Sequence, residues 1–86
     1  MKVVAGVPGD HITIKNEEVK INGKTVVSGF PLAEPYYHHP SQYYEKDEVI
    51  PQGKIFMIGT HRFSDDSRYW GYLDTNYVRG TGYKIY

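Results

Sequence analysis

The chain has 86 residues, which is enough for one domain with a modest core. Ten basic and ten acidic residues give a formal net charge of zero. This balance argues against nucleic acid as the main partner, because phosphate binding needs a clustered positive surplus. The sequence contains no cysteine, which excludes disulfides and cysteine-based zinc sites, and no apolar run approaches the roughly 18 residues of a membrane-spanning helix.

The first part of the chain predicts a β-meander. Residues 2–4 are a short strand candidate, and residues 11–15 alternate apolar and polar side chains with the period of a half-buried strand. Residues 19–21 repeat this alternation. The Asn22-Gly23 pair is a strong hairpin signal, so residues 24–27 are expected to follow as the third strand of the meander.

Residues 29–47 interrupt the pattern with three prolines, two histidines and four tyrosines. A loop of this length in a compact domain is usually functional or partly disordered. Two interpretations stay open: the segment borders a substrate groove, or its tyrosines cover the open end of a small barrel. The adjacent His38 and His39 lack the spacing that places two ligands together, and no acid-rich box accompanies them. We therefore predict neither a metal site nor a cofactor.

The later strands complete an all-β prediction. Residues 54–58 carry apolar side chains on both faces, which predicts a central strand. Residues 69–73 and 77–79 are expected as short strands, and residues 83–86 as the last strand. Nine tyrosines, nine glycines and repeated β-branched runs, without helical periodicity, predict a single β domain over residues 1–86.

A dense polar stretch, GTHRFSDDSRYWG, lies between the apolar strand and the last strands. It holds two acids, two arginines, two serines and a histidine within residues 59–71. An unpaired buried charge lowers the stability of the folded state by several kcal/mol, so Asp66 and Arg68 are interpreted as an ion pair. Local chemistry alone leaves two roles open for this stretch, a functional site or a salt-bridged loop that holds a small barrel together.

Three stretches carry a resemblance to a known family. Residues 64–71, S-x-DSRYWG, resemble the last signature box of the type I signal peptidases, which are membrane-bound proteases with a Ser/Lys dyad. Residues 2–10, KVVAGVPGD, are similar to the family's K-R-x-x-G-x-P-G-D box, and residues 49–59 resemble the strand that leads into the last box. The short separation of the first and last boxes suits compact members, such as the conjugative-transfer signal peptidases.

The resemblance implies a set of site residues. Lys2 takes the position of the general base, and Ser64 that of the serine that hydrogen-bonds it. Asp66 and Arg68 take the place of the supporting ion pair, with Gly59 at the end of the strand before them. The alternative for Lys2 is a solvated lysine at a frayed chain end. A lysine that serves as a base must be neutral, and burial in apolar surroundings favours the neutral amine.

The same resemblance places the nucleophilic serine upstream of the lysine. None of the serines of this chain lies in a box of the S-M-x-P or S-x-P-x-G type. We therefore expect the chain to be the C-terminal part of a signal-peptidase-like catalytic domain, without membrane anchor and nucleophile segment, and inactive alone. The family pattern G-D-N-R-x-N-S-x-DSR becomes GTHRFSDDSR in residues 59–68, and Val3 replaces the arginine after the lysine, which favours a divergent subfamily.

The fold and function that the resemblance implies follow from this. We expect a small, coiled antiparallel sheet or partial barrel, with the first and last boxes adjacent. The implied activity is serine endopeptidase processing of signal-peptide-bearing or conjugative-transfer proteins at the outer face of the cytoplasmic membrane, and the chain itself is expected to be soluble and to self-associate. Two alternatives remain: a noncatalytic peptidase-fold scaffold, or an OB-like module whose tyrosines stack on bases or sugars.

Overall fold

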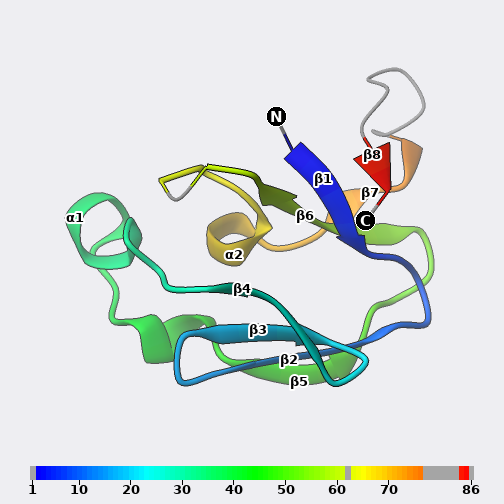
Figure 1. The fold of residues 1–86 in the computed structure, drawn as a ribbon, viewed down its shortest axis with the longest axis horizontal. Coiled ribbons are helices and arrows are strands. Elements are labelled where there is room, and N and C mark those ends of the chain that lie inside the picture. Colours follow the sequence, from blue (N-terminus) through cyan, green and yellow to red (C-terminus); the bar gives the residue numbers. More distant parts are fainter. Residues whose placement is uncertain (1, 62, 77–83, 86) are drawn as a thin grey trace.

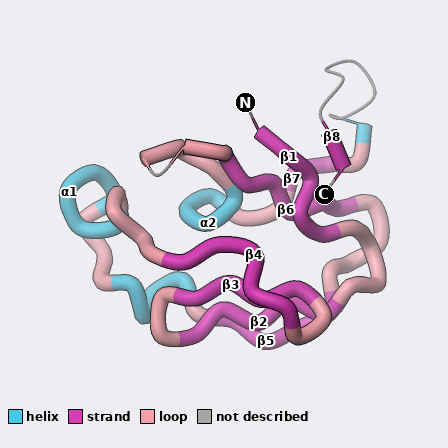
Figure 2. Tube along the Cα trace, viewed as in Figure 1, coloured by secondary structure: helices cyan, strands magenta, loops and turns pink. Residues whose placement is uncertain are grey.

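The computed structural model describes residues 2–61, 63–76 and 84–85, the last two by their backbone. Strands and loops dominate the described residues, and the helices among them are short (Figures 1 and 2). The strands are β1 (Lys2–Gly6), β2 (His11–Lys15), β3 (Glu18–Ile21), β4 (Lys24–Ser28), β5 (Lys46–Val49), β6 (Lys54–Gly59), β7 (Leu73–Asp74) and β8 (Lys84–Ile85). The helices are α1 (Ala33–Tyr37), the 3-10 helix Ser41–Tyr44 and α2 (Ser67–Trp70).

One four-stranded sheet has the order β4-β3-β2-β5, with antiparallel pairing throughout. Its first three strands confirm the predicted meander. The turn between β3 and β4 needs positive φ angles at both central residues, 53° at Asn22 and 82° at Gly23, which these two residue types tolerate best. The fourth strand, β5, was not predicted and comes from the end of the tyrosine-rich segment.

The second sheet has the order β7-β6-β1-β8. Here β1 runs antiparallel to β6 and parallel to β8, so the first and last described strands are neighbours (Figure 1). The two sheets stay separate rather than closing into a complete barrel, which agrees with the predicted partial barrel.

The core lies on both sides of β6. Phe56 and Ile58 are buried in a cluster with the apolar residues of β2 and β3. Ile55 and Met57 point the other way and pack with Val4 of β1. Since both faces of β6 are covered and strands flank it on each side, the prediction of a central strand is confirmed.

The prediction of a strand over residues 69–73 was wrong in its first part. Tyr69 and Trp70 end the helix α2, and strand geometry begins only at Leu73. The cause is local: the Asp66 side chain caps the helix by accepting a hydrogen bond from the Arg68 backbone N–H. The predicted strand over residues 77–79 lies outside the described residues, and of the one over residues 83–86 only Lys84–Ile85 is described, as β8.

The tyrosine-rich segment is more ordered than a loop. It folds into α1, the 3-10 helix and β5, and it closes one end of the core (Figure 1). Tyr44 is buried; its ring stacks on Phe30 at a centroid distance of 5.4 Å and meets the edge of Tyr69 at 5.8 Å. These three rings pack against one another in the core, whereas Tyr36 and Tyr43 of the same segment are exposed.

Candidate active site

The pairing of β1 with β6 brings the first sequence box to the point where the polar stretch begins. In this register Lys2 lies opposite Gly59, and Val3 lies opposite Ile58. The predicted general base therefore stands directly across from the residue that begins the polar stretch. The side chain of Lys2 is half-buried. The backbone pairing thus sets the first box beside the strand that leads into the last box.

Gly59 is where the polar stretch folds back on the strand. A Cβ atom at this position would overlap the Ser64 side chain and would lie 3.5 Å from Asp66 Oδ2. The Gly59 backbone N–H also donates to Asp66 Oδ2 at 2.8 Å. Glycine thus permits Ser64 to pack against the strand opposite Lys2.

The predicted ion pair between Asp66 and Arg68 is present and buried. Arg68 Nε donates to Asp66 Oδ1 and Arg68 Nη2 to Asp66 Oδ2, both at 2.9 Å. Asp66 is 0% and Arg68 3% exposed. Two parallel bonds of this kind are among the strongest that a carboxylate makes, and they fix both side chains in one geometry.

Arg68 also donates hydrogen bonds to the backbone of two neighbouring segments. Its Nη1 donates to the Gly29 carbonyl at 2.9 Å, just after β4, and its Nη2 donates to the Ser64 carbonyl at 3.3 Å. The buried Ser67 hydroxyl, which sequence reasoning missed, accepts from the Met57 backbone N–H at 2.9 Å and ties α2 to β6. The backbone that carries Ser64 is therefore held from behind by an arginine in the core.

Ser64 itself is held lightly. Its hydroxyl oxygen accepts from the His61 backbone N–H at 3.2 Å, and its own N–H donates to the His61 carbonyl at 3.1 Å. Within the described residues no hydrogen bond joins the Lys2 amine to the Ser64 hydroxyl. A hydroxyl that accepts one bond can still donate its proton, so Ser64 keeps the capacity to hold an amine.

Asp65 is a second residue that the sequence did not reveal. Its Oδ1 atom accepts from Trp70 Nε1 at 2.9 Å and from the Tyr37 hydroxyl. The hydrogen bond to Asp65, with burial and the nearby negative charge, raises the pKa of Tyr37 to about 12. The first of these partners shares its box, whereas Tyr37 lies 28 residues away in sequence. No local spacing could have indicated the second one.

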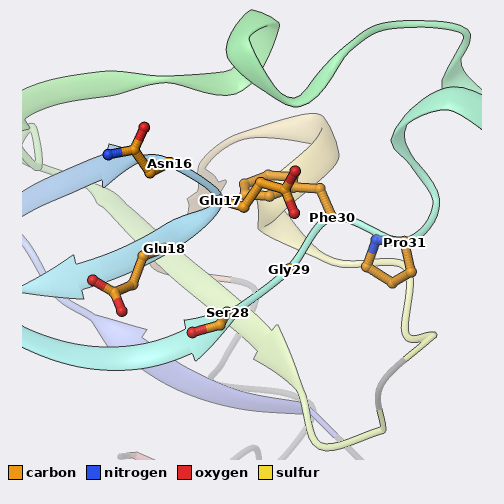
Figure 3. A pocket seen from close by; sticks show the side chains of 7 residues that line it. All are labelled: Asn16, Glu17, Glu18, Ser28, Gly29, Phe30 and Pro31. Carbon is orange, nitrogen blue, oxygen red and sulfur yellow. The ribbon is translucent and has the colours of Figure 1, made fainter.

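A separate hollow of about 550 Å³ lies between the turn at Asn16–Glu18 and the chain after β4 (Figure 3). Its lining residues are Asn16, Glu17, Glu18, Ser28, Gly29, Phe30 and Pro31. None of the predicted site residues lines it. Among the described residues, no group of three or more His, Asp or Glu side chains is placed to hold a metal ion.

The comparisons with known proteins bear on this geometry. The family model described as "Signal peptidase, peptidase S26" matches residues 1–86, the whole chain. The chain belongs to the signal peptidase S26 family. This membership confirms the resemblance indicated by the three sequence boxes, and it relates the chain to peptidases that are hydrolases.

Individual signal peptidases match over most of the chain. Signal peptidase I of Bacillus caldolyticus is 34% identical over an alignment that covers 93% of this chain and 49% of that protein. Signal peptidase I of Leptolyngbya laminosa is 31% identical, with 93% and 37% covered. The chain thus spans about half, or less, of the length of these relatives.

A solved structure supports the fold. A signal peptidase I from Enterococcus faecalis V583 superposes with a TM-score of 0.50 at 26% identity, over 87% of this chain and 74% of that one. This likeness confirms the predicted fold class, a mostly antiparallel β structure of the signal peptidase type. No helix in the described part of the chain is both long and apolar enough to cross a membrane.

Proposed function

We propose that this signal peptidase family member is a serine endopeptidase in which Lys2 is the general base and Ser64 orients its amine. The observation that carries the proposal is the register of β1 and β6, which sets Lys2 across from Gly59. Ser64 packs against that same glycine. The support is thus a juxtaposition of the two predicted residues, produced by strand pairing.

A Ser/Lys peptidase requires a neutral lysine amine beside the hydroxyl nucleophile, because the amine must accept the hydroxyl proton. The amine takes the hydroxyl proton as the oxygen attacks the carbonyl carbon of the scissile bond, and it returns the proton to the leaving amine when the C–N bond breaks. A hydroxyl such as that of Ser64 can orient the amine without stabilising its charged form as a carboxylate would.

The nucleophilic serine is assigned to a segment upstream of Lys2, as in the family pattern. Two serines of this chain have other partners: the buried Ser67 hydroxyl accepts from the Met57 N–H, and the Ser41 hydroxyl donates to Glu17. Since no serine of these 86 residues lies in a box of that family type, we expect the 86 residues alone to be inactive. The proposed substrates are exported proteins that bear signal peptides, with conjugative-transfer proteins as the narrower class, cut at the outer face of the cytoplasmic membrane.

The test is a chimera that restores a nucleophile. The serine-bearing segment of the Bacillus caldolyticus signal peptidase I is joined ahead of this chain, and cleavage of a signal-peptide-bearing precursor is followed by gel shift. We expect cleavage that Lys2→Ala abolishes and that Ser64→Ala lowers by about a factor of 100. Lys24→Ala and Ser41→Ala, at sites away from the two boxes, are the matched controls.

The negative results discriminate among the alternatives. A folded chimera that cleaves neither an exported nor a conjugative-transfer precursor would contradict the peptidase proposal and favour a noncatalytic scaffold. Cleavage that survives Lys2→Ala would reject the assigned base while leaving the peptidase activity in place.

A further inference from the structure

Asp65, the residue after Ser64, connects its loop to the helices α1 and α2. Its carboxylate accepts from the Tyr37 hydroxyl, at the end of α1, and from Trp70 Nε1, at the end of α2. Both donors share the single oxygen Oδ1. The loop that carries Ser64 is therefore held at its exposed side by the bonds of Asp65, while Asp66 and Arg68 hold it on the core side.

The Tyr37 donor is held in place by the packing of its ring against Tyr69. The Tyr37 ring stacks on Tyr69 at a centroid distance of 5.2 Å with the planes 4° apart. The Tyr69 hydroxyl accepts from the Leu32 backbone N–H at 3.2 Å, and the Arg68 guanidinium lies 5.4 Å from the centre of the Tyr69 ring. These contacts fix α1 against α2, so the Tyr37 hydroxyl presents a fixed donor to Asp65.

The Ser64 hydroxyl needs such support because it makes few hydrogen bonds of its own. Its side chain receives one hydrogen bond, at 3.2 Å, from a backbone N–H in the same loop. A bond within the loop cannot fix the loop relative to β1. The position of Ser64 relative to β1 consequently depends also on the contacts of its neighbours in the chain.

We propose that Asp65 is a positioning residue of the Ser/Lys site, which holds Ser64 in orientation toward Lys2 by accepting hydrogen bonds from Tyr37 and Trp70. The inference rests on the proposed function for its catalytic meaning. It also assigns a role to the tyrosine-rich segment, since α1 supplies one of the two donors. Asp65 itself is not assigned any contact with substrate.

The first test uses the 86-residue chain and amide hydrogen exchange. The Ser64 N–H is hydrogen-bonded to the His61 carbonyl, so its protection reports on the loop. Asp65→Leu removes the acceptor, and we expect Ser64 to exchange about tenfold faster, which corresponds to the loss of one or two ordinary hydrogen bonds. Asp65→Asn keeps an oxygen acceptor and should restore most of the protection, a rescue that a requirement for charge alone would not give.

Tyr37→Phe is the second variant, and it removes one donor without touching the loop sequence. Tyr36→Phe is its matched control on the same helix, because Tyr36 is 71% exposed. Amides of β2 serve as the reference for global unfolding. If Ser64 protection is unchanged in both Asp65→Leu and Tyr37→Phe, or if it falls only together with that of β2, the positioning role is rejected.

The second test measures catalysis in the chimera described above. Loss of positioning lowers kcat, by about tenfold in Asp65→Leu, and leaves KM near its original value, because the substrate contacts are intact. Normal kcat in both Asp65→Leu and Tyr37→Phe, in a chimera that cleaves, overturns the inference and leaves the proposed function standing. A chimera that never cleaves rejects the proposed function, while the exchange experiment still decides whether Asp65 holds Ser64 in place.

Discussion

At the scale of single residues, Asp66 combines several structural roles in one carboxylate. It caps α2, accepts from the Gly59 N–H and pairs with Arg68 through both oxygens. Since Asp66 and Arg68 are almost fully buried, exchanging either alone would leave an uncompensated charge in the core. Asp65, its neighbour, is different: it accepts from the half-buried Tyr37 and the exposed Trp70, and its effect on Tyr37 can be measured by titration.

Tyr37 offers that titration. Its hydrogen bond to Asp65, together with burial and the Asp65 charge, raises the pKa of the Tyr37 hydroxyl to about 12. In Asp65→Asn the negative charge is gone, so we expect the pKa of Tyr37 to fall toward the ordinary value of about 10. NMR spectra of the tyrosine ring carbons across this pH range provide the measurement.

The sign of the linked stability change follows from proton binding. Between pH about 10 and about 12 the folded protein keeps the Tyr37 proton while the unfolded chain loses it, so the free energy of unfolding falls as pH rises. The wild-type chain should lose more of this free energy in that window than Asp65→Asn does. An identical Tyr37 titration in the two proteins would show that Asp65 is not its partner in solution.

At the scale of elements, the site is a product of the β1 and β6 pairing and of the sharp return after β6. Lys2 comes from one strand and Gly59 from the other, and Ser64 packs on the glycine from the returning loop. The absence of a side chain at Gly59 is thus a requirement of packing, because its backbone conformation is ordinary extended strand.

Gly59→Ala tests this requirement. The added methyl group would overlap the Ser64 side chain, and we expect a loss of about 1–3 kcal/mol in the free energy of unfolding, as for other overpacked sites. Urea unfolding provides the measurement. The double variant Gly59→Ala with Ser64→Gly restores the space and should recover part of the loss, with Ser64→Gly alone as control. Equal stability of Gly59→Ala and the original chain would mean that Ser64 does not pack there.

Some elements of this arrangement were within reach of the sequence, for identifiable physical reasons. The Asn22-Gly23 turn specifies its hairpin through local backbone angles, and β6 shows its central place by being apolar on both faces. The Asp66 and Arg68 pair was predictable because a charge buried beside an apolar strand is unfavourable unless an opposite charge compensates it.

Other elements were out of reach because their cause is not local. Helix α2 is only four residues long, too short for any periodicity, and the strand β5, KDEV, is mostly charged. The contact between Asp65 and Tyr37 depends on how residues 29–47 fold over the core, which no spacing records. In each case the structure depends on tertiary contacts, which the local sequence does not specify.

At the scale of the whole molecule, the two sheets differ in how their edges are protected. In the described residues, β7 and β8 at the edges of one sheet have only two residues each. The edge strand β5 of the other sheet carries Lys46, Asp47 and Glu48, and charges of this kind discourage pairing with another chain. Its opposite edge, β4, has the sequence KTVVS and is the most permissive edge of the described fold.

We therefore predict that the isolated 86-residue chain self-associates through β4. An edge strand offers unpaired backbone groups, and the half-buried Val26 and Val27 add apolar surface that a second copy could cover. Sedimentation velocity should show a larger species that grows with protein concentration. Val26→Lys places a charge on this edge and should return the chain to a monomer, whereas Val49→Lys, at the already charged edge β5, should leave the association unchanged. A strictly monomeric profile at high concentration would contradict the prediction, and association that persists in Val26→Lys would move the interface away from β4.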